Sequence, residues 1–202
     1  MTRVPGSGSR LLAVVVICLA GVACQLKRPE TTPGRMIEPQ LLAPQAGRPA
    51  GLGSSSANAP APIRLLDTQS RGHIGRRVLR QQPDGELTED PVWRWSSAPD
   101  RYLDTALRLE LASSPVFQLV DVASAPTLAT TLLVLQLETE GGTRLVGAVE
   151  FRFTRTDHVV DTQVVQASEA VSANLPGDLA ATAGRLLRRL ALDGLTRVAR
   201  AP

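Results

Sequence analysis

Cys24 is the residue whose type and position predict chemistry most directly. The chain starts with basic residues at positions 3 and 10 and continues with an uninterrupted apolar run from Leu11 to Ala20. Small residues then lead to the cysteine. A basic start, a short apolar centre and small residues before a cleavage point are typical of a bacterial export signal. The run is shorter than the roughly 20 residues that span a bilayer, so we predict export and not an uncleaved anchor.

The residues before Cys24 resemble the end of a lipobox, in which cleavage leaves the cysteine as the first mature residue and its thiol carries lipid. Gly21 stands where that motif prefers Leu, and Gly21-Val22-Ala23 also fits the small-x-small rule of an ordinary signal. Both interpretations place cleavage before Cys24, and they differ in whether the sulfur is acylated or stays a lone thiol. We predict a signal peptide over residues 1–23 and a palmitate-type modification of Cys24. Gln25, and not Asp, follows the cysteine, which favours the outer membrane with the domain facing the periplasm.

Outside that stretch, few side chains offer catalysis or metal binding. His73 and His158 both stand beside predicted turns, and no second pair of nitrogen or sulfur ligands accompanies either one. The sequence contains no glycine-rich phosphate loop, nucleophile elbow or His-Glu-x-x-His motif. We therefore expect no catalytic residues, no metal and no cofactor, and a protein that is not an enzyme.

Trp93-Arg94-Trp95 is the most specific stretch of the predicted domain, because it holds both tryptophans of the chain. Alternation along a strand places the two indoles on one face. They either pack under the following helix as core or leave one indole exposed to anchor a partner, since Trp is enriched at binding hot spots. Tyr102 can share either role. The candidate partner-binding residues are therefore Trp93, Trp95 and Tyr102.

The charge balance argues against a nucleic-acid partner. The chain has 22 basic and 19 acidic residues and a formal net charge of +3. Loss of the signal removes two of the basic residues and leaves a nearly neutral chain. The basic residues are spread along the sequence, whereas nucleic-acid binding requires a clustered footprint. Both cysteines fall at or before position 24, so the folded part has no disulfide.

Composition divides the mature chain into a linker and a domain. Proline, glycine and serine concentrate between positions 29 and 62, and such a segment buries too little apolar surface to offset its ordering entropy. We expect a lipidated N-terminus and disordered tether over residues 24–62 that holds the domain clear of the membrane. The folded domain is predicted over residues 63–202.

Two stretches show the 3.6-residue spacing of amphipathic helices. The first begins near Ser97, the predicted N-cap, with Pro99 in its first turn, and it ends at Ser113-Ser114-Pro115. The second opens at Pro176-Gly177-Asp178 and carries Gly194 as a kink or close-packing point. The apolar stripes are Leu103, Ala106, Leu107 and Leu111 in the first helix and Leu179, Ala183, Leu186, Leu187, Leu190 and Val198 in the second.

Alternating apolar residues predict strands in the remaining segments. Strands are expected at residues 63–66, 74–80, 86–95, 116–122, 128–138, around 149–153 and at 159–171. Pro91 removes a ladder donor, so an edge position or a bulge is expected there, and Gly141-Gly142 marks a hairpin. Leu133, Leu135 and Leu137 are predicted on one face, as are Val149, Phe151 and Phe153. These elements predict a two-layer α+β domain with a mostly antiparallel sheet and two amphipathic helices.

The segment from Arg94-Trp95 through Pro99 to Leu111-Ala112 resembles the ABC-type transport auxiliary lipoproteins, the outer-membrane component of MCE-type lipid transport systems. In that family a strand and a turn lead to an Arg-Trp pair and then to a Pro-started helix that ends in Leu-Ala. The order of lipobox, tether, meander and closing helix also agrees. The resemblance covers roughly residues 63–200.

This resemblance implies a non-enzymatic lipoprotein that assists a periplasmic MCE protein in lipid trafficking and membrane integrity. The implied partners are the membrane through Cys24, an MCE protein of an ABC transporter and lipid, and a homo-oligomer stays open. Two other interpretations remain. One is a structural or assembly lipoprotein for lipopolysaccharide or secretion machinery, and the other is a periplasmic enzyme.

Overall fold

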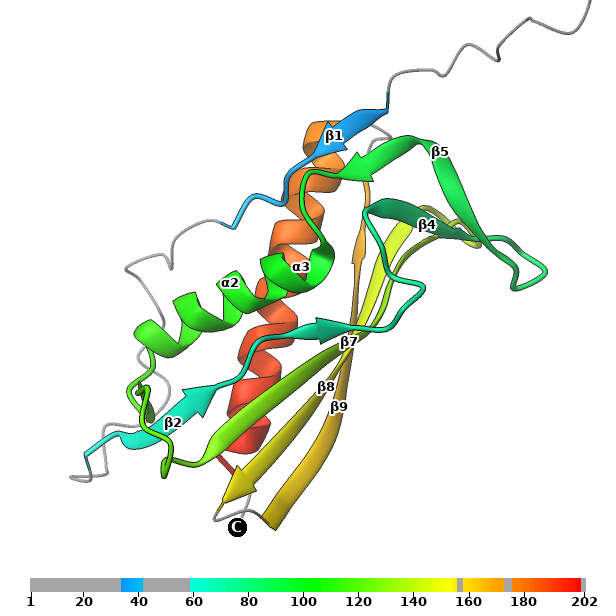
Figure 1. Cartoon of the computed structure of the whole chain (residues 1–202). Coiled ribbons are helices and arrows are strands. Elements are labelled where there is room, and N and C mark those ends of the chain that lie inside the picture. The colour runs from blue at the N-terminus through cyan, green and yellow to red at the C-terminus, as the bar shows by residue number, and fades with distance from the viewer. Residues whose placement is uncertain (1–33, 42–58, 156–157, 173–175, 201–202) are drawn as a thin grey trace, which may run out of the picture. The chain divides into compact units, whose positions relative to one another are not determined.

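The computed structural model describes residues 34–41, 59–155, 158–172 and 176–200, and it confirms the α+β class. A large sheet forms one layer, and the helices α2 (Pro99–Ala112) and α3 (Pro176–Val198) cover one of its faces (Figure 1). Residues from Gly34 onward belong to one compact unit.

A three-stranded antiparallel meander forms the largest part of the sheet. Strands β7 (Thr127–Glu138), β8 (Arg144–Arg155) and β9 (His158–Ala170) pair antiparallel in sequence order. Gly141 and Gly142 turn the first hairpin with φ angles of 70° and 122°, a backbone region that favours glycine. The predicted meander is confirmed.

A register shift between Leu132 and Val134 alters the predicted inward face of β7. Leu135 and Leu137 are buried as expected, but Leu133 is only half-buried and Leu132 takes the core position. The extra residue of such a bulge moves the alternation by one position. Two-residue periodicity alone therefore assigned Leu133 to the wrong face.

One edge of β7 pairs with β8, and its other edge pairs in parallel with three short strands, one after another. They are β2 (Ala61–Leu65), β3 (Gln69–Ser70) and β4 (Arg77–Gln81). Strand β6 (Phe117–Leu119) adds in parallel to β2. Counted by paired residues, the sheet remains mostly antiparallel, as predicted, because the long strands of the meander contribute most of the pairs.

Strand β5 (Leu87–Trp95) returns antiparallel to β4. The register between these strands shifts in the region that contains Pro91, so the expected irregularity is confirmed. The Asp90 carboxylate accepts the backbone N–H groups of Val92 and Trp93 at 2.8 and 2.9 Å. This side-chain turn satisfies donors next to the proline.

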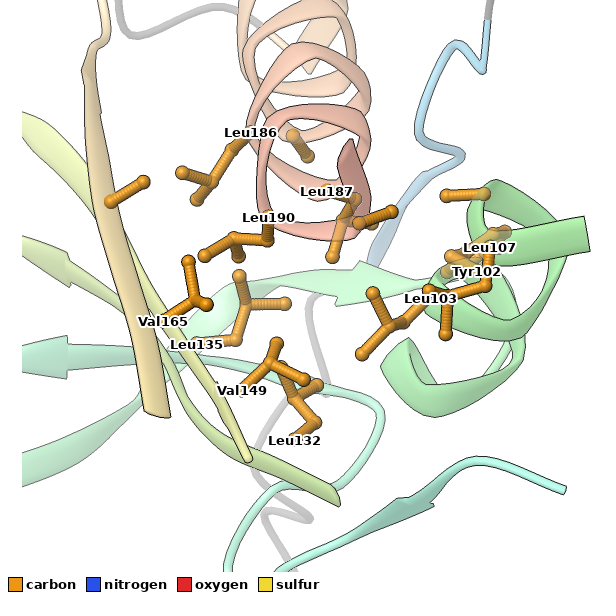
Figure 2. Close-up of a cluster of buried hydrophobic side chains, with 14 of the residues drawn as sticks. Tyr102, Leu103, Leu107, Leu132, Leu135, Val149, Val165, Leu186, Leu187 and Leu190 are labelled. Carbon is orange, nitrogen blue, oxygen red and sulfur yellow. The ribbon is translucent and has the colours of Figure 1, made fainter. Parts of the chain in front are cut away.

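The buried core lies between the sheet and the two helices (Figure 2). Every residue of the two predicted helical stripes is buried. Figure 2 shows Leu186, Leu187 and Leu190 of α3 and Leu103 of α2 pointing toward side chains of the meander. Each such leucine contributes roughly 1.5–3 kcal/mol through burial.

The start of α2 differs from the prediction. The N-cap is Ala98, which makes no side-chain capping bond, and Pro99 occupies the first helical position. Ser97 instead donates its backbone N–H to the Tyr102 hydroxyl at 2.8 Å. Ser97 therefore belongs to the connection that precedes the helix.

Part of the predicted tether belongs to the folded domain. Strand β1 (Arg35–Ile37) pairs in parallel with β5, and Ile37 is 1% exposed. The Gln40 N–H donates to the Ala180 carbonyl of α3 at 3.0 Å. A Cβ atom at Gly184 would lie 2.1 Å from the Gln40 carbonyl oxygen, so glycine permits this close approach. The domain therefore begins by Gly34 and not at Ile63, and residues 24–62 are not one continuous tether.

Candidate functional site

Cys24 and the signal peptide over 1–23 lie outside the described residues, so the predicted lipidation stays a prediction. Neither helix in the described part of the chain is long and apolar enough to cross a membrane. The same part contains no group of three His, Cys, Asp or Glu side chains that could hold a metal ion. His73 and His158 are both exposed.

The three candidate partner-binding residues lie in the core. Trp93 and Tyr102 are each 8% exposed and Trp95 is 1% exposed. Alternation along β5 does place both indoles on one face, and that face is the buried one. The structure thus presents Trp93, Trp95 and Tyr102 as packing residues, with no exposed indole for a partner.

Hydrogen bonds tie the end of β5 to its neighbours. The Trp95 N–H donates to the Arg76 carbonyl at 2.6 Å, and the Ser96 N–H donates to the Ile37 carbonyl at 2.8 Å. The Arg76 guanidinium returns a bond to the Ser96 carbonyl at 2.6 Å. The Ser96 hydroxyl also bonds to the Tyr102 hydroxyl. The connection between β5 and α2, which includes the Arg94-Trp95 pair, is therefore tied together by hydrogen bonds that stabilise the fold.

Asp90 and Arg80 form an ion pair beside this junction. The Arg80 Nε donates to the Asp90 carboxylate at 2.5 Å, and the Asp90 side chain is 5% exposed. Burial opposes ionisation, but the bonds from Arg80 and from the Val92 and Trp93 N–H groups outweigh it and lower the pKa of Asp90. The carboxylate stays charged and holds the turn at Pro91.

A second buried pair joins the two helices. Glu110 of α2 is 5% exposed and accepts two bonds from the Arg188 guanidinium of α3, at 3.0 and 2.9 Å. Such a two-bond pair fixes the relative position of its partners. Glu110 and Arg188 therefore tie α2 to α3.

Glu110 also lines a small apolar cavity where α2 and α3 end. Its other walls include Val116, Phe117, Leu192 and Leu195, and its volume is about 150 Å³. Pockets that enclose drug-sized ligands measure roughly 300–1,000 Å³. The cavity can accept one apolar side chain, but it cannot enclose a phospholipid.

A larger open basin of about 570 Å³ lies over β1, β4 and β5. Its lining includes the arginines at 76, 77 and 94, together with Met36, Leu87 and Glu89. Sequence reasoning missed this group, because its members come from β1 and from the β4–β5 hairpin with the residues just before it, and β1 is far from that hairpin in the chain. The one signal in the sequence was the alternation of side chains along a strand. It places Arg94 on the face opposite to Trp93 and Trp95.

Comparison with known proteins supports the fold. No family model and no curated protein matches the sequence. Among solved structures, the chain is similar to protein XCC0632 from Xanthomonas campestris, which carries the family description DUF330. The identity is 13%, the similarity covers 83% of this chain and 97% of that one, and the TM-score is 0.65. Hypothetical protein CT253 from Chlamydia trachomatis is 12% identical over 71% of this chain and 98% of its own, with a TM-score of 0.53. At these identities the likeness establishes the fold alone.

Proposed function

We propose that the chain is an exported lipoprotein that is anchored through Cys24 at the periplasmic face of the outer membrane. It serves there as a non-enzymatic auxiliary component of an MCE-type ABC lipid transport system. The observation that carries the proposal is the segment from Arg94-Trp95 through Pro99 to Leu111-Ala112, which follows the family pattern. In the fold this segment is the β5–α2 junction.

The position of β1 favours a domain held close to its anchor. Gly34 stands ten positions after Cys24, and an extended chain spans at most about 3.6 Å per residue. The first residue of the compact unit therefore lies within ~36 Å of the modified cysteine. The linker between Cys24 and the folded domain is therefore shorter than the tether over residues 24–62 that composition predicted.

The cavities favour a binding role over lipid carriage. The apolar cavity where α2 and α3 end, at about 150 Å³, is too small to hold a lipid. We therefore propose that the MCE partner holds the lipid, while this chain contributes an interaction surface at the membrane. His73 and His158 are exposed, and loss of an activity on substituting either one would favour the enzyme alternative.

Crosslinking in cells tests the partner. A photo-crosslinking residue at Val164 or Val122, which are 51% and 54% exposed, samples two surface positions without disturbing the core. The proposal predicts capture of an MCE protein and altered outer-membrane lipid composition and detergent resistance on deletion. Capture of an outer-membrane β-barrel alone would favour the assembly alternative, and capture of the chain itself would indicate a homo-oligomer. No MCE capture together with unchanged membranes on deletion would contradict the proposal.

A further inference from the structure

Three side chains form a row across the outer face of β1, β5 and β4. Met36 of β1 is in register with Arg94 of β5, and Arg94 is in register with Arg77 of β4. These strands lie side by side at one end of the sheet (Figure 1). Neighbours in register share a face, and this face is opposite to the one that buries Trp95. The row is the floor of the basin described above.

The basin has an uncompensated positive charge. Like charges directly opposite one another destabilise a strand pair, and Arg77 and Arg94 stand in that relation. Glu89 neutralises Arg77 at 2.7 Å. Arg94 is half-buried and has neither an ion pair nor a side-chain hydrogen bond within the described part of the chain. With Arg76 included, the basin holds three arginines against one glutamate.

The Arg94 side chain lies against the backbone of Gly34. It lies over Gly34, where an added Cβ atom would come within 2.9 Å of the Arg94 Nε. A half-buried guanidinium that has no acceptor among the described residues is suited to an oxyanion, because its planar fork matches phosphate.

Apolar side chains border this charge. Met36 is 59% exposed and Leu87 is 43% exposed, and both line the basin. Cationic groups beside exposed apolar groups suit an amphiphile that has an anionic head and an apolar tail. Gly34 directly precedes β1 and stands ten positions after Cys24, so the basin adjoins the end of the domain that leads to the anchor.

We infer that this basin binds the phosphate headgroups of anionic phospholipids in the membrane that holds the anchor. Arg94 and Arg76 contact the phosphate, while Met36 and Leu87 enter the apolar boundary below it. The placement at the membrane rests on the proposed anchoring through Cys24. This contact turns the β1 end of the sheet toward the bilayer and leaves the rest of the domain free for a protein partner.

Vesicle pelleting tests the inference without the anchor. The protein is the chain from Gln25 to Pro202, which retains the whole compact unit that begins at Gly34. We expect it to pellet with vesicles of mixed phosphatidylglycerol and phosphatidylcholine, and not with phosphatidylcholine alone. Added salt weakens the binding because exposed charges are screened.

Two variants and a matched control locate the contact. Each unit charge near an anionic surface changes binding roughly fivefold, so Arg94→Glu should weaken it about tenfold or more. Met36→Ser should weaken it severalfold without changing charge. Arg101→Glu makes the same charge change at an exposed position outside the basin and should alter binding less than about twofold. Thermal melts confirm that each variant is folded.

Several outcomes overturn the inference. One is a lack of binding to the anionic vesicles, and another is equal weakening by Arg94→Glu and Arg101→Glu. Displacement by inorganic phosphate at matched ionic strength would identify a small-anion site instead. Loss of MCE crosslinking in Arg94→Glu with unchanged vesicle binding would identify a protein interface. Failure of the anchoring or transport proposals appears separately, in cell fractionation and crosslinking, which use no vesicles.

Discussion

Gly194 of α3 lies directly against the ring of Phe151 in β8. A Cβ atom at position 194 would stand 2.0 Å from the Phe151 Cζ, a distance that real contacts do not reach. The glycine therefore lets the long helix pack on the sheet, and the predicted close-packing role is confirmed.

Gly194→Ala should destabilise the protein by about 1–3 kcal/mol. In a helix alanine is more favourable than glycine by about 1 kcal/mol. The added methyl group overpacks against Phe151, and this costs more than that gain. Gly177→Ala in the same helix is the control, because the space beside Gly177 is open, and it should leave stability unchanged or raised. Denaturant unfolding measures both variants, and equal stability of the two would contradict the packing account.

The segment before residue 59 should contribute to stability. Ile37→Ala removes a side chain that is 1% exposed, and such truncations cost about 2–5 kcal/mol. Met36→Ala, one position away on the exposed face, should change stability by less than about 0.5 kcal/mol. A chain that starts at Ala59 should melt well below one that starts at Gln25. Identical melting of the two chains would show that β1 is dispensable, as composition alone had predicted.

The Asp90–Arg80 pair should make stability depend on pH in acid. The pKa of Asp90 is lowered in the folded state. The ionised carboxylate therefore stabilises the fold fully above the ordinary carboxyl pKa of about 3.9, and this stabilisation is lost as pH falls through the folded-state pKa. Asp90→Asn should cost about 2 kcal/mol at neutral pH, because it removes charged hydrogen bonds.

The difference between Asp90→Asn and the unchanged protein should shrink progressively below about pH 4. Glu89→Gln removes the carboxylate of an exposed pair and should cost less than about 1 kcal/mol. Urea unfolding at several pH values measures both. A deficit for Asp90→Asn that persists undiminished in acid would refute the assignment to the ion pair.

Trp95 should behave as a core residue. Its side chain is 1% exposed, so Trp95→Ala should cost about 3–5 kcal/mol of stability. Trp93→Phe leaves one indole, whose fluorescence should be poorly quenched by acrylamide in the native state. Ready quenching of that indole, or a Trp95→Ala variant that melts normally while losing its partner, would restore the hot-spot interpretation.

Cys24→Ala should release the protein from the membrane. The substitution removes the thiol that we propose is acylated, so acyl labelling should disappear and the domain should fractionate with soluble periplasm. Cleavage by the ordinary small-x-small rule can still occur in the variant. A variant that stays in the membrane fraction would refute the lipid anchor.

Local sequence determined the element types and, apart from the bulge at Leu133 in β7, the inward faces of the long elements. The leucine stripes of α2 and α3 repeat over several turns. Gly141-Gly142 marks a hairpin turn whose positive φ angles few other residues adopt. Phe151 and Phe153 alternate cleanly into the core. Periodicity of this kind is a local property of the chain, so the α+β class and the meander followed from it.

Tertiary structure alone decided which short segments pair and which charges meet. The three residues of β1 are too few to show a period, and the burial of Ile37 depends on the pairing of β1 with the edge of β5. The parallel pairing of β2, β3 and β4 along one edge of β7 links residues more than fifty positions apart. The row of Met36, Arg94 and Arg77 exists only once those strands are in register. Such pairings depend on edges and surfaces that form only when the rest of the chain has folded, so no local pattern encodes them.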